Sequence, residues 1–268
     1  MQKLLYDTKL KRLLFFKTKA NSDFWDKHWK KYDLKKSITK SKNNNFIIKN
    51  TKKFLKTGRI LEGGCGRGDK VYCLQENGYD AYGVDYALKT IEKIKTALPE
   101  LKVSVADVRK LPFEDNFFDG YWSLGVIEHF YEGYLDILKE MKRVVRKGGY
   151  IFLTFPYMSP LRKLKAKLGL YKKLDKNKIN KNEFYQYALN PESVIKTFQK
   201  YGFTFKYQKS WDGIKGFKDE VTLLKTPLQK LYDYKRKKSI IRKVRKAVNN
   251  LLKPFASHMM LLIFKNSR

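Results

Sequence analysis

Short apolar runs alternate with amphipathic stretches between Arg59 and Phe155. Such alternation is typical of consecutive βα units, which assemble into a mainly parallel sheet covered by helices. The apolar runs predict strands at residues 59–62, 80–84, 102–106, 118–124 and 149–155. The amphipathic stretches predict helices at about residues 68–77, 87–97 and 131–146, each closed by a nearby Gly or Pro. The pattern therefore predicts an α/β fold.

The same pattern resumes later in the chain. Asn190 and Pro191 suit the N-cap and the first position of a helix that ends at Gly202. Apolar runs then predict strands at residues 203–210 and 258–264. We expect these elements to extend the same sheet.

Two segments depart from the βα rhythm. Residues 157–188 carry nine Lys or Arg among apolar side chains, directly after a strand's carboxyl end. Since α/β proteins bind ligands at that end of the sheet, this segment is predicted to cap the site. Residues 227–253 predict a basic amphipathic helix, because apolar residues recur at helical spacing opposite a cationic face. They are Ile241, Val244, Val248 and Leu251. A helix docked on the sheet and a membrane-surface or RNA-binding element both fit this second pattern.

The positive charge lies on the flanks of the chain. Residues 1–57 hold 17 Lys or Arg against 4 Asp or Glu, and residues 156–268 hold 28 against 7. Residues 58–155 hold 14 against 15, so a uniform preference for Lys does not explain the net charge of +33. Solvated outer Lys side chains are one explanation; an anionic partner, such as a phosphate-bearing substrate, a membrane face or RNA, is the other.

Cysteine and histidine positions give no sign of a metal site. The two cysteines, Cys65 and Cys73, do not have metal-ligand spacing, and the three histidines are far apart in the sequence. No apolar run is long enough for a signal peptide or a membrane span. We expect a soluble, cytoplasmic protein without a metal, whose basic flanks are compatible with peripheral contact to a membrane.

The most informative stretch is RILEGGCGRGDK, in which Gly64, Gly66 and Gly68 form a GxGxG arrangement directly after the first strand. Glycine permits the tight turn into a helix and lets a ligand approach the backbone. Dinucleotide-binding chains place the third glycine one residue later, where this chain has Asp69. An acid at that position, together with Glu62 before the loop, would repel a pyrophosphate. S-adenosylmethionine has no phosphate and is therefore compatible with both acids.

This stretch resembles the first motif of the class I S-adenosylmethionine-dependent methyltransferases, an acid and one residue followed by GxGxG. Three further landmarks follow in that family's order: AYGVD ends the second strand on Asp85, VSVADVRKL places Asp107 after the third, and GYWSLG supplies the fourth. The resemblance covers about residues 58–155. It implies a Rossmann-like, seven-stranded, mostly parallel sheet with helices on both faces and an antiparallel last hairpin.

The resemblance also implies S-adenosyl-L-methionine as cofactor and assigns roles to single residues. Asp85 would hold the ribose hydroxyls, Tyr86 would stack beside the adenine, and Asp107 with the Val108 amide would hydrogen-bond the adenine ring. The cofactor-binding set that it implies is Glu62, Gly63, Gly64, Gly66, Gly68, Asp85, Tyr86, Asp107, Val108, Leu124 and Gly125.

Methyl transfer from a sulfonium depends mainly on holding the acceptor in line with the methyl group. A hydroxyl acceptor benefits from a base, and His129, shortly after the fourth strand, is the catalytic candidate. Glu128 is a candidate for orienting His129 or a substrate hydroxyl, although helix capping and packing explain both residues equally well. The other candidates for substrate binding are Trp25 and Trp29, which resemble the family's aromatic lead-in helix, and Tyr157 in the cap.

The domain plan and the acceptor remain open at this point. We expect a basic N-terminal extension with a lead-in helix at residues 1–57, and a methyltransferase domain at 58–268 with insertions at about 157–188 and 212–256. The favoured acceptor is a small or lipid- or sugar-linked molecule, methylated on a hydroxyl oxygen. RNA methylation is the alternative, and the basic flanks would then bind the backbone. A non-catalytic binding module is disfavoured by the intact glycines and acids.

Overall fold

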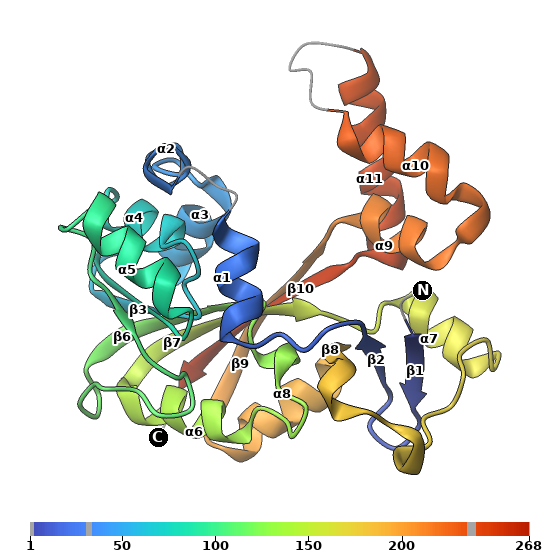
Figure 1. Ribbon diagram of the computed structural model, residues 1–268, viewed down its shortest axis with the longest axis horizontal. Coiled ribbons are helices and arrows are strands. Elements are labelled where there is room, and N and C mark those ends of the chain that lie inside the picture. Colours follow the sequence, from blue (N-terminus) through green and yellow to red (C-terminus); the bar gives the residue numbers. More distant parts are fainter. Residues whose placement is uncertain (1–2, 31–33, 235–239, 268) are drawn as a thin grey trace.

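Two sheets organise the chain, for which the computed structural model describes residues 3–30, 34–234 and 240–267. The larger sheet has seven strands in the order β5-β4-β3-β6-β7-β10-β9, and the smaller has three in the order β1-β2-β8 (Figure 1). The strands are β1 (Lys3–Asp7), β2 (Arg12–Phe16), β3 (Arg59–Gly63), β4 (Asp80–Asp85), β5 (Val103–Val105), β6 (Phe118–Leu124), β7 (Val145–Pro156), β8 (Phe184–Ala188), β9 (Phe203–Trp211) and β10 (Met259–Asn266).

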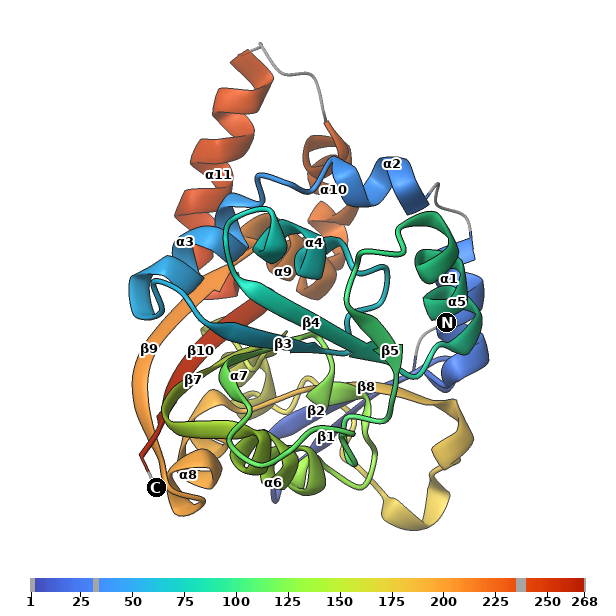
Figure 2. The same ribbon diagram turned by 90° about the vertical axis from the view of Figure 1, so that its left-hand side faces the viewer.

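Helices cover both faces of the larger sheet. Figure 2 shows α3 and α4 above it and α6 and α8 below it. The α-helices are α1 (Ser22–Lys30), α2 (Leu34–Thr39), α3 (Asn45–Phe54), α4 (Asp69–Gln75), α5 (Leu88–Ala97), α6 (Leu135–Val144), α7 (Pro160–Lys167), α8 (Pro191–Lys200), α9 (Gly213–Glu220), α10 (Lys225–Asp233) and α11 (Ile240–Ala256). Short 3-10 turns are η1 (Ile127–His129), η2 (Lys176–Lys178), η3 (Lys181–Glu183) and η4 (Thr222–Leu224).

The Rossmann-like prediction is confirmed by the strand pairing. β3 pairs in parallel with β4 and β6, β4 with β5, and β6 with β7, whereas β10 runs antiparallel to both β7 and β9. Parallel strands are buried on both faces and therefore read as continuous apolar runs. One core cluster accordingly packs under α6 and α8, and a second lies under α3, α4 and α5.

Two predicted boundaries were wrong. The helix predicted at 131–146 begins only at Leu135, after a turn, and ends at Val144. Val145 pairs with Phe118 in the sheet, so the fifth predicted strand begins four residues earlier than the apolar run indicated. Strand pairing with β6 overrides the helical pattern at this junction.

The smaller sheet was not predicted. The β1–β2 hairpin pairs antiparallel with β8, which belongs to the predicted cap at 157–188. The N-terminal extension and the cap are therefore joined in one structure beside the larger sheet (Figure 1). Leu13 and Tyr187 are fully buried within this joint packing.

The helix predicted at 227–253 is two helices, α10 and α11. Tyr234 has an extended backbone, with ψ at 113°, and ends α10. The run Lys235–Ser239 lies outside the described residues.

A buried ion network connects the cap to the segment before α10. The guanidinium of Arg162 on α7 donates to Glu220 at the end of α9, with an Nε–Oε1 distance of 2.8 Å. Lys165 Nζ and the Tyr171 hydroxyl both donate to the other oxygen of Glu220, at 2.8 Å and 2.6 Å. Arg162 and Glu220 are both buried, so this network fixes α7 against α9.

Candidate functional site

The glycine loop lies where β3 ends, at the carboxyl edge of the parallel strands. Gly64 and Gly66 have φ values of +79° and +50°, in the left-handed region that favours glycine. The amides of Gly64 and Cys65 both donate to the carbonyl oxygen of Val84, which fixes the loop against β4. Gly68 then leads into α4.

Asp85, the last residue of β4, clamps this loop. Its Oδ2 accepts a hydrogen bond from the Gly66 amide at 2.8 Å, and its Oδ1 accepts one from the Ala87 amide at 2.9 Å. Each carboxylate oxygen keeps a second lone pair for a ligand. Burial raises the pKa of Asp85, while the backbone donors act in the opposite direction.

A cavity of about 190 Å³ opens beside the loop and Asp85. It is lined mainly by glycines and aromatic rings from four separate parts of the chain. The lining residues are Trp25, Trp29, Gly64, Gly66, Asp85, Tyr86, Leu124, Gly125, Val126, His129 and Phe130. The structure thus brings together most of the predicted site residues, including both tryptophans and the candidate base.

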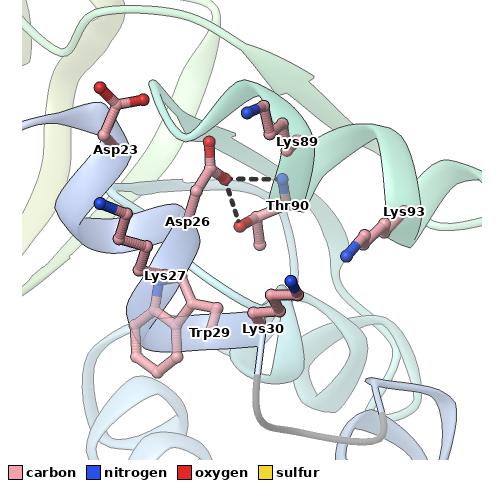
Figure 3. A pocket seen from close by; sticks show the side chains of 8 residues that line it. All are labelled: Asp23, Asp26, Lys27, Trp29, Lys30, Lys89, Thr90 and Lys93. Atoms are coloured by element: carbon pink, nitrogen blue, oxygen red, sulfur yellow. Dashed lines mark hydrogen bonds between the residues drawn. The ribbon is translucent and has the colours of Figure 1, made fainter.

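Helix α1 covers the cavity and is tied to the turn after β4. Ser22 Oγ donates to the Tyr86 carbonyl at 2.8 Å, and the Tyr86 hydroxyl donates to the Ala20 carbonyl at 2.6 Å. Asp26 Oδ1 accepts from both the amide and the hydroxyl of Thr90, at 2.9 Å and 2.7 Å (Figure 3). The residue before α5, Ala87, gives no side-chain cap, so Asp26 supplies the missing acceptor from another helix.

Trp29 packs directly on the glycine loop. A Cβ at Gly66 would lie 3.0 Å from Cζ2 of Trp29, so only glycine allows this approach without a shift. The guanidinium of Arg67 lies 5.3 Å from the centroid of the Trp29 ring, within the range of a cation–π contact. The loop and α1 are therefore complementary in shape and in charge.

His129 lies among aromatic rings at the far side of the cavity. Its Nδ1 is 2.7 Å from the carbonyl oxygen of Tyr185 on β8, which fixes the proton on Nδ1 and leaves Nε2 as an acceptor. The ring centroids of Trp25 and Tyr185 lie 5.2 Å and 5.1 Å away. Burial lowers the pKa of His129 to about 4, so the imidazole is neutral at physiological pH.

Two buried carboxyl groups lie near the cavity but outside its lining. Oε2 of Glu62 and Oε2 of Glu128 are both buried with no hydrogen-bond partner among the described residues. Burial raises the pKa of Glu128 to about 8 and that of Glu62 well above its ordinary value. The tautomer of His129 is set by the Tyr185 carbonyl rather than by Glu128.

Asp107 and Tyr157 are arranged differently from the rest of the predicted set. The carboxylate of Asp107 is half-exposed and paired with the Arg109 guanidinium, whose hydrogen bonds lower the pKa of Asp107. The side chain of Val108 is buried in the core. Tyr157 is also buried, with its hydroxyl beside Ser210 and Ser257. Tyr157 therefore packs toward β9 rather than lining the cavity.

Gly63 and Gly68 also lie outside the cavity lining, and each is required by packing. A Cβ at Gly63 would fall 1.8 Å from the Tyr121 hydroxyl, and one at Gly68 would fall 2.9 Å from a methyl group of Leu101. These two glycines support the loop from behind.

A second cavity, of about 340 Å³, lies on the other side of Trp29 between α1 and α5 (Figure 3). Its lining is mainly charged and consists of Asp23, Asp26, Lys27, Trp29, Lys30, Lys89, Thr90 and Lys93. One of the two acids, Asp26, is already bonded to Thr90. Four lysines against two acids give the lining a net charge of +2.

Three contributors to the site were missed by sequence reasoning. Phe130 and Val126 line the cavity and lie beside His129 in the sequence, so the stretch GVIEHF could have indicated them. Tyr185 gives no such signal, because it reaches His129 only through the pairing of β2 with β8.

Two further features concern the described ranges of the chain. No group of three or more His, Cys, Asp or Glu side chains is arranged there to hold a metal ion. None of the helices in residues 3–30, 34–234 and 240–267 is both long and apolar enough to cross a bilayer.

Residues 61–153 match a family model described as a methyltransferase domain, and this match covers β3 through most of β7. Residues 61–153 are thus similar to methyltransferase domains, and the fold around them agrees with that of the class I S-adenosylmethionine-dependent methyltransferases. A curated relative, the demethylmenaquinone methyltransferase of Staphylococcus aureus strain MRSA252, is 32% identical over 151 residues, covering 53% of this chain and 62% of that protein. The chain thus spans less than two thirds of the curated relatives that it matches.

Solved structures agree with the methyltransferase fold. The PH0226 protein of Pyrococcus horikoshii superposes with a TM-score of 0.52 at 19% identity, covering 82% of this chain and 87% of that one. The geranyl diphosphate C-methyltransferase of Streptomyces coelicolor superposes with a TM-score of 0.53 at 13% identity, covering 83% and 79%.

The methyltransferase domain has features that suit the family's cofactor, S-adenosylmethionine. A Cβ at Gly64 would fall 2.5 Å from a methyl group of Val126, so glycine there keeps the cavity open. The unpaired Oε2 of Glu62 and the spare lone pairs of Asp85 offer acceptors for an ammonium group and for hydroxyls. The site lacks the features of a pyrophosphate site, since Asp69 follows the loop.

Proposed function

We propose that the protein transfers a methyl group from S-adenosylmethionine to a small or lipid- or sugar-linked acceptor, on a hydroxyl oxygen. The observation that carries this proposal is that the cavity has two facing walls. The glycine loop and Asp85 form one side, and the aromatic rings of α1 and the His129 region form the other. Such a site favours an acceptor that enters as a small group over one that lies across an open surface.

When bound, the cofactor supplies an electrophilic methyl group on a sulfonium. In our proposal Asp85 accepts hydrogen bonds from the ribose hydroxyls, and Tyr86 packs beside the adenine. Asp107 is proposed to bind the adenine amino group from the rim. Glu62 accepts from the ammonium group, and Leu124 with Gly125 forms the wall against which the cofactor rests.

The rings of Trp25, Trp29 and Phe130 exclude water and present π faces toward the cationic centre, which favours its binding. We propose that the lone pair on Nε2 of His129 accepts the proton of the acceptor hydroxyl as the new bond to carbon forms. The Tyr185 carbonyl holds the ring in the orientation and tautomer that this step needs. Glu128 lies close behind as a candidate to bind the acceptor, which its protonated carboxyl could do by donation.

Comparisons favour a small-molecule acceptor over RNA. The curated relatives are named for demethylmenaquinone, and one structural neighbour is named for geranyl diphosphate. The cationic cavity beside α1 is also compatible with a phosphate-bearing acceptor. RNA is supported only by the basic flanks, because the lining of the cavity itself contains no Lys or Arg.

We further propose a division of the chain that follows the function. Residues 58–268 form the methyltransferase domain with insertions at about 157–188 and 212–256. Residues 1–57, which contribute α1 to the cavity and share the smaller sheet with the first insertion, close over the cofactor side.

Calorimetry with S-adenosylmethionine tests the cofactor assignment. Asp85→Ala removes the loop clamp and the ribose acceptor, and loss of such charged hydrogen bonds is expected to weaken binding by about 10- to 100-fold. Asp80→Ala is the matched control, because Asp80 begins the same strand and is bonded to Lys102 and Arg59. Equal affinities for the two variants would refute the assignment. The acceptor is tested by incubating the loaded enzyme with hydroxylated quinones, lipid-linked sugars and RNA, with S-adenosylhomocysteine release as the readout.

A further inference from the structure

Helix α11 exposes an apolar face that nothing in the chain covers within the described residues. Ile240, Val244, Ala247, Leu251 and Phe255 recur at intervals of four, three, four and four, which places them on one side of the helix. Ile240 and Leu251 are each 79% exposed, and Val244 and Phe255 are 46% and 40% exposed. These five residues, the apolar stripe, extend over about 22 Å at the helical rise per residue.

The opposite side of α11 explains why the stripe faces outward. Gly213 and Gly216 on α9 approach the backbone of α11 so closely that a Cβ would fall 2.6 Å from the Asn249 carbonyl and 1.7 Å from that of Ala256. Arg245 also donates to the carbonyl of Tyr234 at 2.9 Å, which ties α11 to the end of α10. The packing side is therefore occupied by α9 and α10, and the stripe points away from it.

Cations flank the stripe. Lys243 lies one turn from both Ile240 and Ala247, and Lys246 follows it on the same edge; both side chains are exposed. Residues 225–256 contain 11 Lys or Arg and a single acid, Asp233. An apolar stripe bordered by cations is the pattern of a helix that lies in a membrane interface.

The arm, α10 and α11 together, is packed at its base on α9 and projects from there away from the larger sheet (Figure 1). It joins the sheet where β9 ends at Trp211 and β10 begins at Met259, and Met259 pairs with Pro156 at the end of β7. This is the same edge of the sheet at which β3 and β4 present the glycine loop and Asp85. A surface bound by the arm would therefore lie on the cofactor side of the molecule.

We propose that the arm docks the protein on an anionic lipid bilayer, with the apolar stripe of α11 among the acyl chains and the flanking lysines at the headgroups. RNA would use the cations but has no need of exposed Ile, Val and Leu side chains. A second copy of the chain would cover the stripe only by bringing two strongly cationic arms together. The inference goes beyond the transfer reaction, and its test needs neither cofactor nor acceptor.

Co-sedimentation of the full chain with vesicles tests the proposal, using phosphatidylcholine with and without one quarter phosphatidylglycerol. We expect the protein to bind the vesicles that contain phosphatidylglycerol and not those of phosphatidylcholine alone. Lys243→Gln/Lys246→Gln should weaken that binding by about 30-fold, the equivalent of about 1 kcal/mol per lysine. Val244→Ser/Leu251→Ser should weaken it by about tenfold or more, because the apolar area that enters the interface is lost.

Matched variants separate the arm from the general positive charge. Lys56→Gln/Lys95→Gln removes the same charge from exposed positions outside the arm, and Leu10→Ser/Leu135→Ser removes exposed leucines elsewhere. Both variants should bind as the unaltered protein does. Circular dichroism melting shows whether each variant is folded.

Three results would overturn the proposal. The first is no binding of the unaltered protein to anionic vesicles. The second is full vesicle binding by the stripe variant, because only an attraction between charges would then remain. In that case, an RNA gel shift that the lysine variant loses and the stripe variant keeps would assign the arm to nucleic acid. The third is a dimer in light scattering that the stripe variant abolishes, which would assign the stripe to a second copy.

Discussion

Glu220 is the acid on which the buried network between α7 and α9 depends. Its two oxygens accept from Arg162, Lys165 and Tyr171, and the side chains of Arg162 and Glu220 are only 2% and 3% exposed. Glu220→Gln keeps the shape and one carbonyl acceptor but removes the negative charge. The guanidinium of Arg162 then stays buried without a counter-charge.

Breaking one partner of a buried pair costs about 3–5 kcal/mol. Because the amide oxygen of Gln still accepts a hydrogen bond, we expect the lower value, about 3 kcal/mol. For a chain of this size that loss lowers the melting temperature by about 6–12 °C. The exposed pair of Lys163 and Glu192, also joined to α7, is the control, since Glu192→Gln should cost less than about 1 kcal/mol.

The pH dependence provides a second check on Glu220. Although burial acts to raise it, Arg162 and its neighbours hold the pKa of Glu220 below the ordinary value of 4.5. A group of this kind stabilises the folded state above its ordinary pKa, and the stabilisation is lost as the pH falls through the folded value. The difference in urea-unfolding free energy between unaltered protein and Glu220→Gln should therefore shrink from pH 7 to pH 3.5. Equal stabilities of Glu220→Gln and Glu192→Gln at pH 7 would refute the reasoning.

Other predictions concern the site itself. Gly66→Ala should weaken S-adenosylmethionine binding in calorimetry, because the new Cβ would lie 3.0 Å from the Trp29 ring. Gly78→Ala controls for backbone strain, because Gly78 has φ at +87° and no neighbouring atom within 4 Å of a Cβ; it should leave the affinity unchanged. Asp26→Ala removes the acceptor for Thr90 and should lower the free energy of urea unfolding by about 1 kcal/mol. Asp23→Ala, at an exposed position of the same helix, should have no effect, and equal losses of stability in the two variants would contradict the capping role. Since the pKa of His129 is about 4, the rate should stay level from pH 8 to pH 5 and fall only near pH 4, and a fall near pH 6.5 in a pH–rate profile would argue against His129 as the base.

Local signals made the half of the candidate site around the glycine loop predictable. The glycine loop and Asp85 follow directly from apolar strand runs, and their order along the chain fixes their order at the sheet edge. Leu124 and Gly125 could be placed for the same reason, because they end β6. Each of these positions depends only on where a parallel strand stops.

Contacts between distant segments could not be predicted from such signals. The β1–β2 hairpin shows only a short apolar run, and nothing in that run indicates that β8 is its partner. Tyr157 was assigned to the site because it follows β7, yet the side chain turns toward Ser210, where the antiparallel hairpin offers hydroxyl partners. The pairing of Asp107 with Arg109 likewise depends on side-chain orientation, which spacing along the chain leaves undetermined.

The pairing of β2 with β8 has a consequence for how the protein matures on the ribosome. Roughly 170 residues separate Phe16 from its partner Phe184. At bacterial and eukaryotic synthesis rates the hairpin waits about 8–34 s before β8 emerges. During that interval its apolar residues have no sheet to join, and the imidazole of His129 has no carbonyl from Tyr185 to hold it. A nascent chain stalled before residue 184 should therefore contain a formed glycine loop but an unfinished environment around His129, with the hairpin as the segment most exposed to chaperones.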